Sequence, residues 1–299
     1  MRENREDWVT EQINERTKGL DKLGIEEILR RINEEDRFVV QAVESVIPTL
    51  AKVVERVVES FRSGGRLLYV GAGTSGRLGV LDASEIPPTF GEPPERVQGI
   101  VAGGTQALHL AVEGAEDDLQ SAVDSVSERN ISTHDVVIGI TCSGRTPFVL
   151  AALEEAGRRG ALRVLLTVNP VDPESVPADW VLAPVVGPEV IAGSTRMKGG
   201  TATKLILNMI TTTTMVCLGK VYGNLMVDLQ PTNQKLVQRA VRMISGQTGL
   251  NEIRSQALLE EADGHVKTAL AMHELSCGVQ EARRRLESVQ GFLGRLGVE

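Results

Sequence analysis

The sequence predicts an α/β fold: a doubly wound parallel sheet of about five strands, with an N-terminal helical segment and a small helical C-terminal unit. Between residues 66 and 183, short runs rich in Val, Ile and Leu alternate with amphipathic stretches of helical periodicity. Such alternation is typical of a parallel sheet with helices on both faces. From Arg196 onward the short apolar runs stop and helical patterns remain, which indicates a separate helical unit.

The predicted strands lack a clean alternation of apolar and polar residues, as expected for strands buried on both faces. They comprise residues 66–70, 97–102, 135–140, 162–168 and 180–183. Predicted helices at 76–84, 105–128 and 146–159 separate the first four.

The segments on either side of the sheet have a different character. Residues 1–24 are polar and predict an extended or weakly ordered arm, and residues 25–63 predict a helix with a kink at Pro48. Downstream, helical patterns cover 198–220, 232–245, 250–263, 266–276 and 278–294. We therefore expect three parts: an N-terminal arm with helices (1–56), an α/β domain (57–220) and a helical C-terminal unit (221–299).

Composition excludes several classes of protein. The formal net charge of −8 argues against a nucleic-acid surface, which needs a basic patch. The three cysteines are widely spaced and the four histidines show no metal-ligand spacing, so we expect neither a metal site nor a disulfide framework. The N-terminal residues lack the apolar run of a signal peptide, and no stretch approaches the roughly 18 apolar residues of a membrane span. We therefore expect a cytoplasmic protein.

A glycine-rich motif, GAGTSGR at 71–77, follows the first predicted strand and opens a helix. Its glycines fit the dinucleotide pattern G-x-G-x-x-G, but that site also needs an acidic residue at the end of the second strand, where residues 102–104 are Ala-Gly-Gly. Thr74 and Ser75 instead place two hydroxyls beside the backbone N–H groups of a helix start, which suits a terminal phosphate. A glycine turn with a simple Ser/Thr cap is the alternative.

A second hydroxyl-rich motif, TCSGRTPF at 141–148, follows the third predicted strand and also opens a helix. Ligands of open α/β sheets bind beyond the carboxyl ends of the strands, so two such loops in one sheet favour a binding site there. For Arg145 alone, a surface salt bridge is the alternative. A third motif, GSTRMKGGTATK at 193–204, offers Ser194 and Thr195 either as ligand contacts or as caps of the long helix that follows.

Two acidic stretches accompany these motifs. Glu85, in DASE, closes the first predicted helix, where a carboxylate is electrostatically unfavourable and therefore hints at a function. Further on, AVEGAEDD at 111–118 places four carboxylates on the predicted helix 105–128, and we expect most of them to be solvated.

GAGTSGR followed by SGRT resembles the sugar-phosphate loops of the SIS (sugar-phosphate isomerase) family. Longer strings resemble the N-acetylmuramic acid 6-phosphate etherase family over nearly the whole chain: TEQINERT, GAGTSGRLGVLDASEIPPTFG, AVEGAED, SGRTPFV, PVVGPEV, STRMK and LGKVYGNLMVD. Thr141, Cys142, Gly199 and Thr203 depart from the residues commoner in that family, and the last two are similar to those of the related glucokinase regulatory protein.

The resemblance implies an SIS domain at 57–220, a homodimer, and activity without a metal or nucleotide cofactor. It implies a carbon–oxygen lyase that cleaves the lactyl ether of N-acetylmuramate 6-phosphate to N-acetylglucosamine 6-phosphate and D-lactate, in cell-wall recycling. The family's catalytic glutamates fall on Glu85, as acid, and Glu116, as base. The expected substrate-binding residues are Gly73, Thr74, Ser75, Ser143, Gly144, Arg145, Thr146 and Ser194.

Such a substrate requires a base for the C2 proton, an acid for the leaving lactyl oxygen, and water that adds afterwards. Two other functions remain open on the same fold: a non-catalytic sugar-phosphate sensor, which needs no carboxylate pair, and an aldose–ketose isomerase, which needs no leaving-group acid.

The spacing of Ser75 and Glu85 bears on how a site is assembled. In one straight helix these two residues, ten apart, would be separated by about 15 Å. That is roughly twice the span from a C6 phosphate to a C3 ether oxygen. Either the helix ends early near Asp82 and Glu85 folds back, or Glu85 reaches a sugar held by a partner subunit, which is our expectation.

Overall fold

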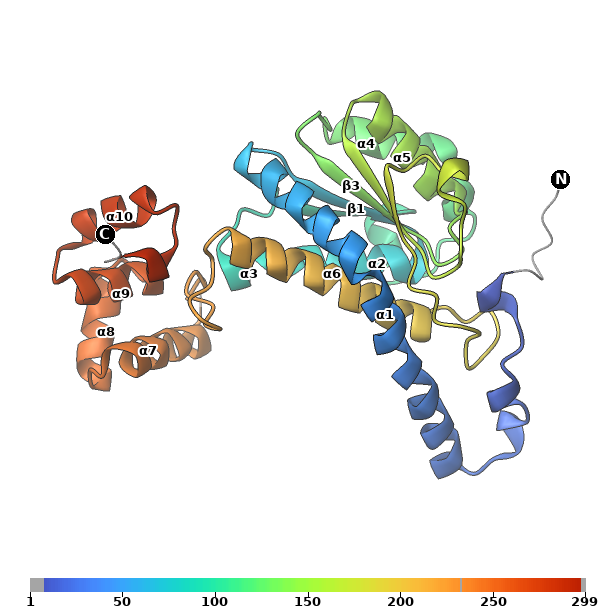
Figure 1. Ribbon diagram of the computed structural model, residues 1–299, viewed down its shortest axis with the longest axis horizontal. Coiled ribbons are helices and arrows are strands. Elements are labelled where there is room, and N and C mark those ends of the chain that lie inside the picture. The colour runs from blue at the N-terminus through green and yellow to red at the C-terminus, as the bar shows by residue number, and fades with distance from the viewer. Residues whose placement is uncertain (1–7, 232, 297–299) are drawn as a thin grey trace. The chain divides into compact units, whose positions relative to one another are not determined.

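The computed structural model describes residues 8–231 and 233–296 (Figure 1). The chain divides into two compact units, Met1–Ser84 with Glu95–Ile210 and Glu85–Pro94 with Thr211–Glu299. The three-part division made from the sequence stays a prediction. No helix of the described ranges is long and apolar enough to cross a membrane.

The first unit is built on a five-stranded parallel sheet of order β2-β1-β3-β4-β5. Its strands are β1 (Leu67–Gly71), β2 (Val97–Val101), β3 (Val136–Ile140), β4 (Leu162–Leu166) and β5 (Trp180–Leu182). All four pairings are parallel, which confirms the predicted fold class and the five predicted strands. Every residue of β1 and β3 is buried, and this double burial explains their continuous apolar character.

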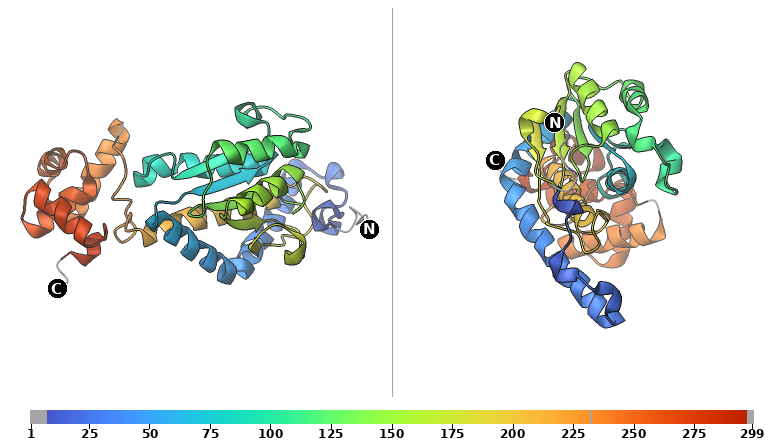
Figure 2. Two further views of the ribbon diagram at one scale, coloured as in Figure 1. Left: turned by 90° about the horizontal axis from the view of Figure 1, so that it is seen from above. Right: turned by 90° about the vertical axis from the view of Figure 1, so that its right-hand side faces the viewer.

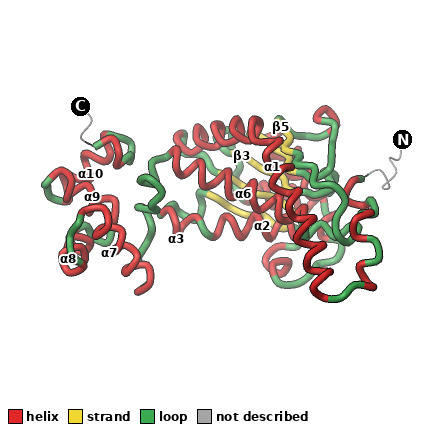
Figure 3. Tube along the Cα trace, turned by 60° about the horizontal axis from the view of Figure 1, so that its bottom comes forward, coloured by secondary structure: helices red, strands yellow, loops and turns green. Residues whose placement is uncertain are grey.

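Helices cover both faces of the sheet (Figures 2 and 3). On one face, α4 (Leu119–Glu128) and α5 (Pro147–Arg158) pack on a cluster that includes Leu68, Val137 and Leu165. On the other face lie α1 (Ile25–Arg62), α2 (Gly73–Ser84) and the first part of α6 (Lys198–Cys217). The sheet is therefore doubly wound, as predicted.

The contact of α2 with the sheet depends on one glycine and one carboxylate. A Cβ at Gly79 would lie 2.8 Å from the Cβ of Tyr69, so the close approach of helix to strand requires glycine there. The buried Asp82 accepts hydrogen bonds from the Tyr69 hydroxyl (3.0 Å) and from the Asn208 amide of α6 (2.7 Å). These contacts fix the helix that carries the first glycine-rich motif.

Two predictions about local structure were wrong. The predicted helix 105–128 is instead two 3₁₀ turns, Gly104–Leu108 and Ala115–Asp117, followed by α4. Gly103 and Gly114 have φ of 83° and 73°, a conformation that ends helices and that other residues rarely adopt. The polar arm is also more ordered than expected: residues 8–24 form three 3₁₀ turns, Val9–Glu11, Glu15–Thr17 and Leu20–Lys22. Residues 1–7 lie outside the described residues.

The long N-terminal helix is confirmed as α1, which contains Pro48. The kink at Pro48 stays a prediction. The second unit contains α3 (Ile86–Phe90), which the sequence did not predict, and four helices that it did. These are α7 (Gln234–Thr248), α8 (Glu252–Glu261), α9 (Val266–Leu275) and α10 (Val279–Ser288). They share a core that includes Ile244, Leu259 and Val266.

Candidate active site

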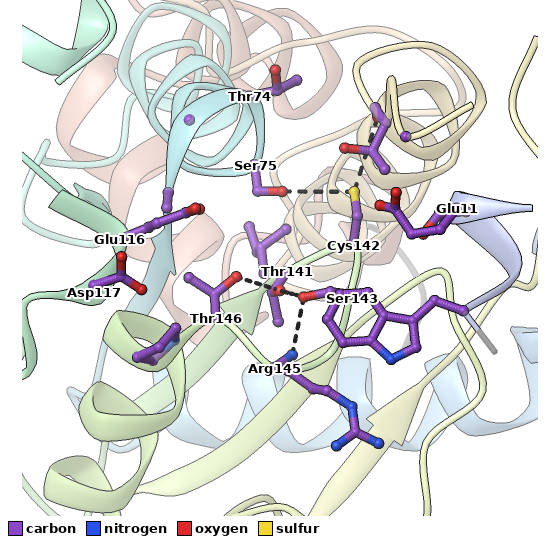
Figure 4. Close-up of a pocket in the computed structure, with 18 residues that line it drawn as sticks. Glu11, Thr74, Ser75, Glu116, Asp117, Thr141, Cys142, Ser143, Arg145 and Thr146 are labelled. Atoms are coloured by element: carbon purple, nitrogen blue, oxygen red, sulfur yellow. Dashed lines mark hydrogen bonds between the residues drawn. The ribbon is translucent and has the colours of Figure 1, made fainter. Parts of the chain in front are cut away.

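A pocket of about 490 Å³ lies at the carboxyl ends of β1 and β3 (Figure 4). In this strand order the chain winds outward in opposite directions from β1 and β3, so their loops diverge and leave a crevice. The described lining residues include Trp8, Thr10, Glu11, Gly73, Thr74, Ser75, Glu116, Asp117, Thr141, Cys142, Ser143, Arg145, Thr146, Gly193 and Thr195.

The loop after β1 presents the start of α2 to the pocket. Gly71 and Gly76 are required there, because a Cβ at Gly76 would lie 2.5 Å from the Gly71 carbonyl oxygen. Thr74 and Ser75 therefore occupy the first turn of a twelve-residue helix, where N–H groups have no partner within the helix. Hydroxyls and N–H groups at a helix start are an arrangement that favours anions.

The loop after β3 is organised by Thr141. Its hydroxyl is hydrogen-bonded to the hydroxyls of Ser143 (3.1 Å) and Thr146 (2.7 Å), and the Arg145 N–H donates to Ser143 Oγ (3.2 Å). Gly144 turns the chain with φ of 75°. Three hydroxyls are thus gathered at the start of α5.

Cys142 lies where the two loops meet. Its Sγ is 3.9 Å from Ser75 Oγ and 4.0 Å from the Thr195 carbonyl oxygen. Burial raises the pKa of the Cys142 thiol, although both of these contacts act in the opposite direction. At neutral pH the group is therefore a neutral spacer between the loops.

Asn169, which the sequence analysis missed, ties the second loop to the N-terminal arm. Its buried amide donates to the Cys142 carbonyl (2.9 Å) and to the Thr10 hydroxyl (2.9 Å), and its Oδ1 accepts from the Thr10 N–H (3.3 Å). The residue follows β4 at the same edge of the sheet as the two loops, and that position is the signal that could have identified it.

The acidic side of the pocket comes from the second 3₁₀ turn rather than from a helix. Glu116 and Asp117 line the pocket, and Figure 4 shows them together on the side opposite Glu11. Asp118 instead caps α4, because its side chain accepts a hydrogen bond from the Ser121 N–H (2.9 Å). The expectation of four carboxylates on one helix was therefore wrong.

The start of α6 is capped by a residue that the sequence did not suggest. The buried Glu189 carboxylate accepts from the backbone N–H groups of Lys198 (3.0 Å) and Gly199 (2.9 Å). Ser194 and Thr195, the predicted caps, precede this turn. Burial raises the pKa of Glu189, against the lowering effect of the two N–H groups.

The first residue of α6, Lys198, forms a buried ion pair with Glu35 of α1. Lys198 Nζ is 2.8 Å from Glu35 Oε2, and their side chains are 0% and 2% exposed. Arg16 and Asn14 of the N-terminal arm also donate to Glu35. Burial alone would raise the pKa of Glu35, but these hydrogen bonds outweigh it and hold the pKa at about 2. The pair joins α1, α6 and the arm.

The structure brings most of the predicted site residues together. The pocket lining contains Gly73, Thr74, Ser75, Ser143, Arg145, Thr146 and Glu116. Gly144 shapes its loop, and Ser194 is flanked by two lining residues without being one of those named for the pocket. Glu85 is not in the lining described either; it is exposed and precedes α3 at the start of the second unit. Within residues 8–231 and 233–296, no group of three or more His, Cys, Asp or Glu side chains is placed to hold a metal ion.

The chain is similar to known proteins in sequence and in structure. The family model for the glucokinase regulatory protein N-terminal SIS domain matches residues 49–156. A phosphoheptose isomerase from Francisella tularensis superposes with a TM-score of 0.46 at 21% identity, over 63% of this chain and 98% of that one.

Two curated relatives are named N-acetylmuramic acid 6-phosphate etherase. That of Salinibacter ruber is 52% identical over 96% of this chain and 93% of its own length. That of Geobacillus thermodenitrificans is 50% identical over 96% and 98%. Identity of this order over nearly the full length of both chains shows that the protein belongs to the N-acetylmuramic acid 6-phosphate etherase family.

Proposed function

We propose that this protein cleaves the D-lactyl ether of N-acetylmuramate 6-phosphate, giving N-acetylglucosamine 6-phosphate and D-lactate. The observation that carries the proposal is the full-length identity to etherases, combined with a pocket in which hydroxyl-rich loops face Glu116. The reaction is that of a carbon–oxygen lyase in amino-sugar catabolism and cell-wall recycling. We expect the reaction to take place in the cytoplasm.

The two loops are suited to the 6-phosphate. Thr74, Ser75, Ser143 and Thr146 supply hydroxyls at the starts of α2 and α5, where unpaired N–H groups favour an anion. Among the described lining residues, three carboxylates accompany one guanidinium, that of Arg145. Phosphate binding in this pocket therefore depends on neutral donors and helix starts more than on cations.

The chemistry follows from the substrate. Ring opening exposes an aldehyde at C1 and acidifies the C2 proton, which Glu116 removes as base. The lactyl oxygen leaves from C3 as Glu85 protonates it, because an alkoxide is a poor leaving group. Water then adds to C3 of the unsaturated aldehyde. No step calls for a metal or a nucleotide, and we expect activity to survive exhaustive chelation.

We further propose that Glu85 acts on a sugar held by the partner subunit of a homodimer. Helix α2 runs without interruption from Gly73 to Ser84, so Ser75 and Ser84 are about 14 Å apart along its axis. The alternative, an early helix end near Asp82, finds no support because Asp82 lies inside α2. The uninterrupted length of α2 supports our proposal that the site is shared across the interface.

The deciding experiment measures D-lactate released from N-acetylmuramate 6-phosphate by the purified chain. A sensor would release none, and an isomerase would interconvert sugar phosphates without lactate. In oxygen-18 water, elimination and hydration should label the glucosamine product and leave the lactate unlabelled. Label in the lactate would mean displacement at the lactyl carbon and would refute the mechanism.

Glu116→Gln, with Glu113→Gln as control, tests the base. Both residues are exposed and lie three positions apart, but Glu116 lines the pocket and Glu113 is not in the lining described. We expect Glu116→Gln to lose C2 proton exchange with deuterated water and Glu113→Gln to keep it. Equal exchange in both variants would remove Glu116 from the role of base.

A further inference from the structure

The side of the pocket that is lined by the N-terminal arm takes no part in the reaction proposed above. The 3₁₀ turn Val9–Glu11 brings a third carboxylate, that of Glu11, to the lining. In Figure 4 this side chain points into the pocket from the side opposite Glu116 and Asp117, beyond Ser75 and Cys142. A ligand held by the phosphate loops would therefore have acidic groups on two sides.

The backbone beneath Glu11 is fixed from several directions. Thr10 is 1% exposed, its carbonyl accepts from the Gly193 N–H (2.8 Å), and its N–H and hydroxyl bond to Asn169. Asn169 also holds the Cys142 carbonyl, so the turn is registered against the second phosphate loop. The position of Glu11 relative to the pocket is thus set by buried contacts although its own side chain is exposed.

The Glu11 carboxylate oxygens are available to accept hydrogen bonds from a ligand. Among the described residues, no hydrogen bond or ion pair is formed by the Glu11 side chain, whereas the exposed Glu15 of the next turn pairs with Lys18 (2.7 Å). Glu11 Oε2 lies against Gly193, 3.1 Å from where a Cβ would stand, so a larger residue there would displace it. An ionised carboxylate accepts hydrogen bonds at both oxygens and donates none.

The negative charge of Glu11 would weaken the binding of an anionic substrate unless the carboxylate also formed hydrogen bonds with it. The proposed substrate carries a phosphate and a lactyl carboxylate, and the Glu11 carboxylate repels both of these negative charges. A carboxylate improves binding there only if it accepts hydrogen bonds from neutral donors on the ligand. The neutral donors that such a sugar offers away from its phosphate are its hydroxyl groups, with one acetamido N–H at C2.

We propose that Glu11 is a further substrate-binding residue, which accepts hydrogen bonds from the sugar hydroxyls on the side of the pocket away from Glu116. The inference rests on the proposed function for the identity of the sugar. It extends the site to the N-terminal arm, so that the arm contributes to the choice of a sugar phosphate over phosphate alone.

The test compares how Glu11→Ala changes the affinity for a sugar phosphate with how it changes the affinity for inorganic phosphate. In Glu11→Ala, affinity for N-acetylglucosamine 6-phosphate, measured by calorimetry, should fall about ten- to a hundredfold, the effect expected for hydrogen bonds to a charged group. Inhibition or binding by inorganic phosphate should be unchanged or tighter, because one negative charge has been removed. A folding defect would instead weaken the binding of both ligands.

Glu15→Ala is the matched control, since it removes the same charge from the neighbouring turn and breaks only an exposed ion pair. We expect it to leave both affinities unchanged. Wild-type affinity of Glu11→Ala for the sugar phosphate, or equal loss for both ligands, would overturn the inference. Failure of the wild-type chain to release lactate would instead refute the proposed function, because the binding comparison does not depend on turnover.

Discussion

Replacing Lys198 with Met would remove one partner of the buried ion pair that joins α1, α6 and the N-terminal arm. The ammonium is fully buried and 2.8 Å from Glu35, so its loss leaves a carboxylate inside the protein with fewer donors. Removing one partner of a buried pair costs about 3–5 kcal/mol. Because Arg16 and Asn14 still donate to Glu35, we expect the lower end, about 3 kcal/mol.

An independent estimate agrees with this magnitude. A carboxyl whose pKa falls from 4.5 to about 2 on folding contributes roughly 3 kcal/mol at neutral pH. The hydrogen bonds from Arg16, Lys198 and Asn14 are together responsible for that lowering. The value is the net of these hydrogen bonds and the opposing effect of burial, and the Lys198 ammonium is one of its sources.

The assay is urea unfolding at neutral pH, followed by circular dichroism. Lys204→Met is the control, because Lys204 is exposed on the same helix. We expect Lys198→Met to lower the unfolding free energy by about 3 kcal/mol and the control by less than about 0.5 kcal/mol. Adding Glu35→Met to Lys198→Met should restore part of the loss, since the stranded carboxylate is gone. Similar midpoints for Lys198→Met and Lys204→Met would refute the reasoning.

Three further predictions concern pH, phosphate and the dimer. The pKa of Glu35 is lowered on folding, so the stability contributed by its ionised carboxylate is complete above about pH 4.5 and is lost as the pH falls toward 2. The difference in unfolding free energy between wild type and Glu35→Gln should therefore narrow over that range, and a constant difference would contradict the prediction. Ser75→Ala should mainly raise KM, and unphosphorylated N-acetylmuramate should be a poor substrate; equal kcat/KM with and without the phosphate would remove Ser75 from this role. Mixing Ser75→Ala with Glu85→Gln chains should restore up to about a quarter to a half of wild-type activity if sites are shared. Activity near zero after confirmed subunit exchange would exclude sharing.

The sheet and its two hydroxyl-rich loops were predictable because they depend on local patterns. Continuous apolar runs identified β1 and β3, and a parallel sheet necessarily gathers the loops after them at one edge. The motifs of 71–77 and 141–148 could therefore be placed side by side from the sequence alone. The pocket lining confirms that placement, while the chemical roles of its residues stay predictions.

Other features could not be predicted for physical reasons. The amphipathic pattern of 105–128 favours a helix, but the left-handed Gly114 interrupts it, and Glu116 is presented by a short turn instead. The contacts of Glu35 with Lys198 and of Thr10 with Asn169 join residues more than 150 positions apart. Periodicity reports on neighbours within a few turns, so pairings of this range leave no signal in a single sequence.

Those long separations also bear on how the protein is made. Thr10 of the arm leaves the ribosome before Asn169 and Gly193, which anchor it and are synthesised more than 150 residues later. At roughly 5–20 residues per second, the arm waits about 10 to 30 s for its binding surface. The arm therefore completes the pocket only after its anchoring residues have been made. In a nascent chain stalled before residue 169, both hydroxyl-rich loops would be present, but the turn that carries Glu11 would lack the contacts that hold it against the pocket.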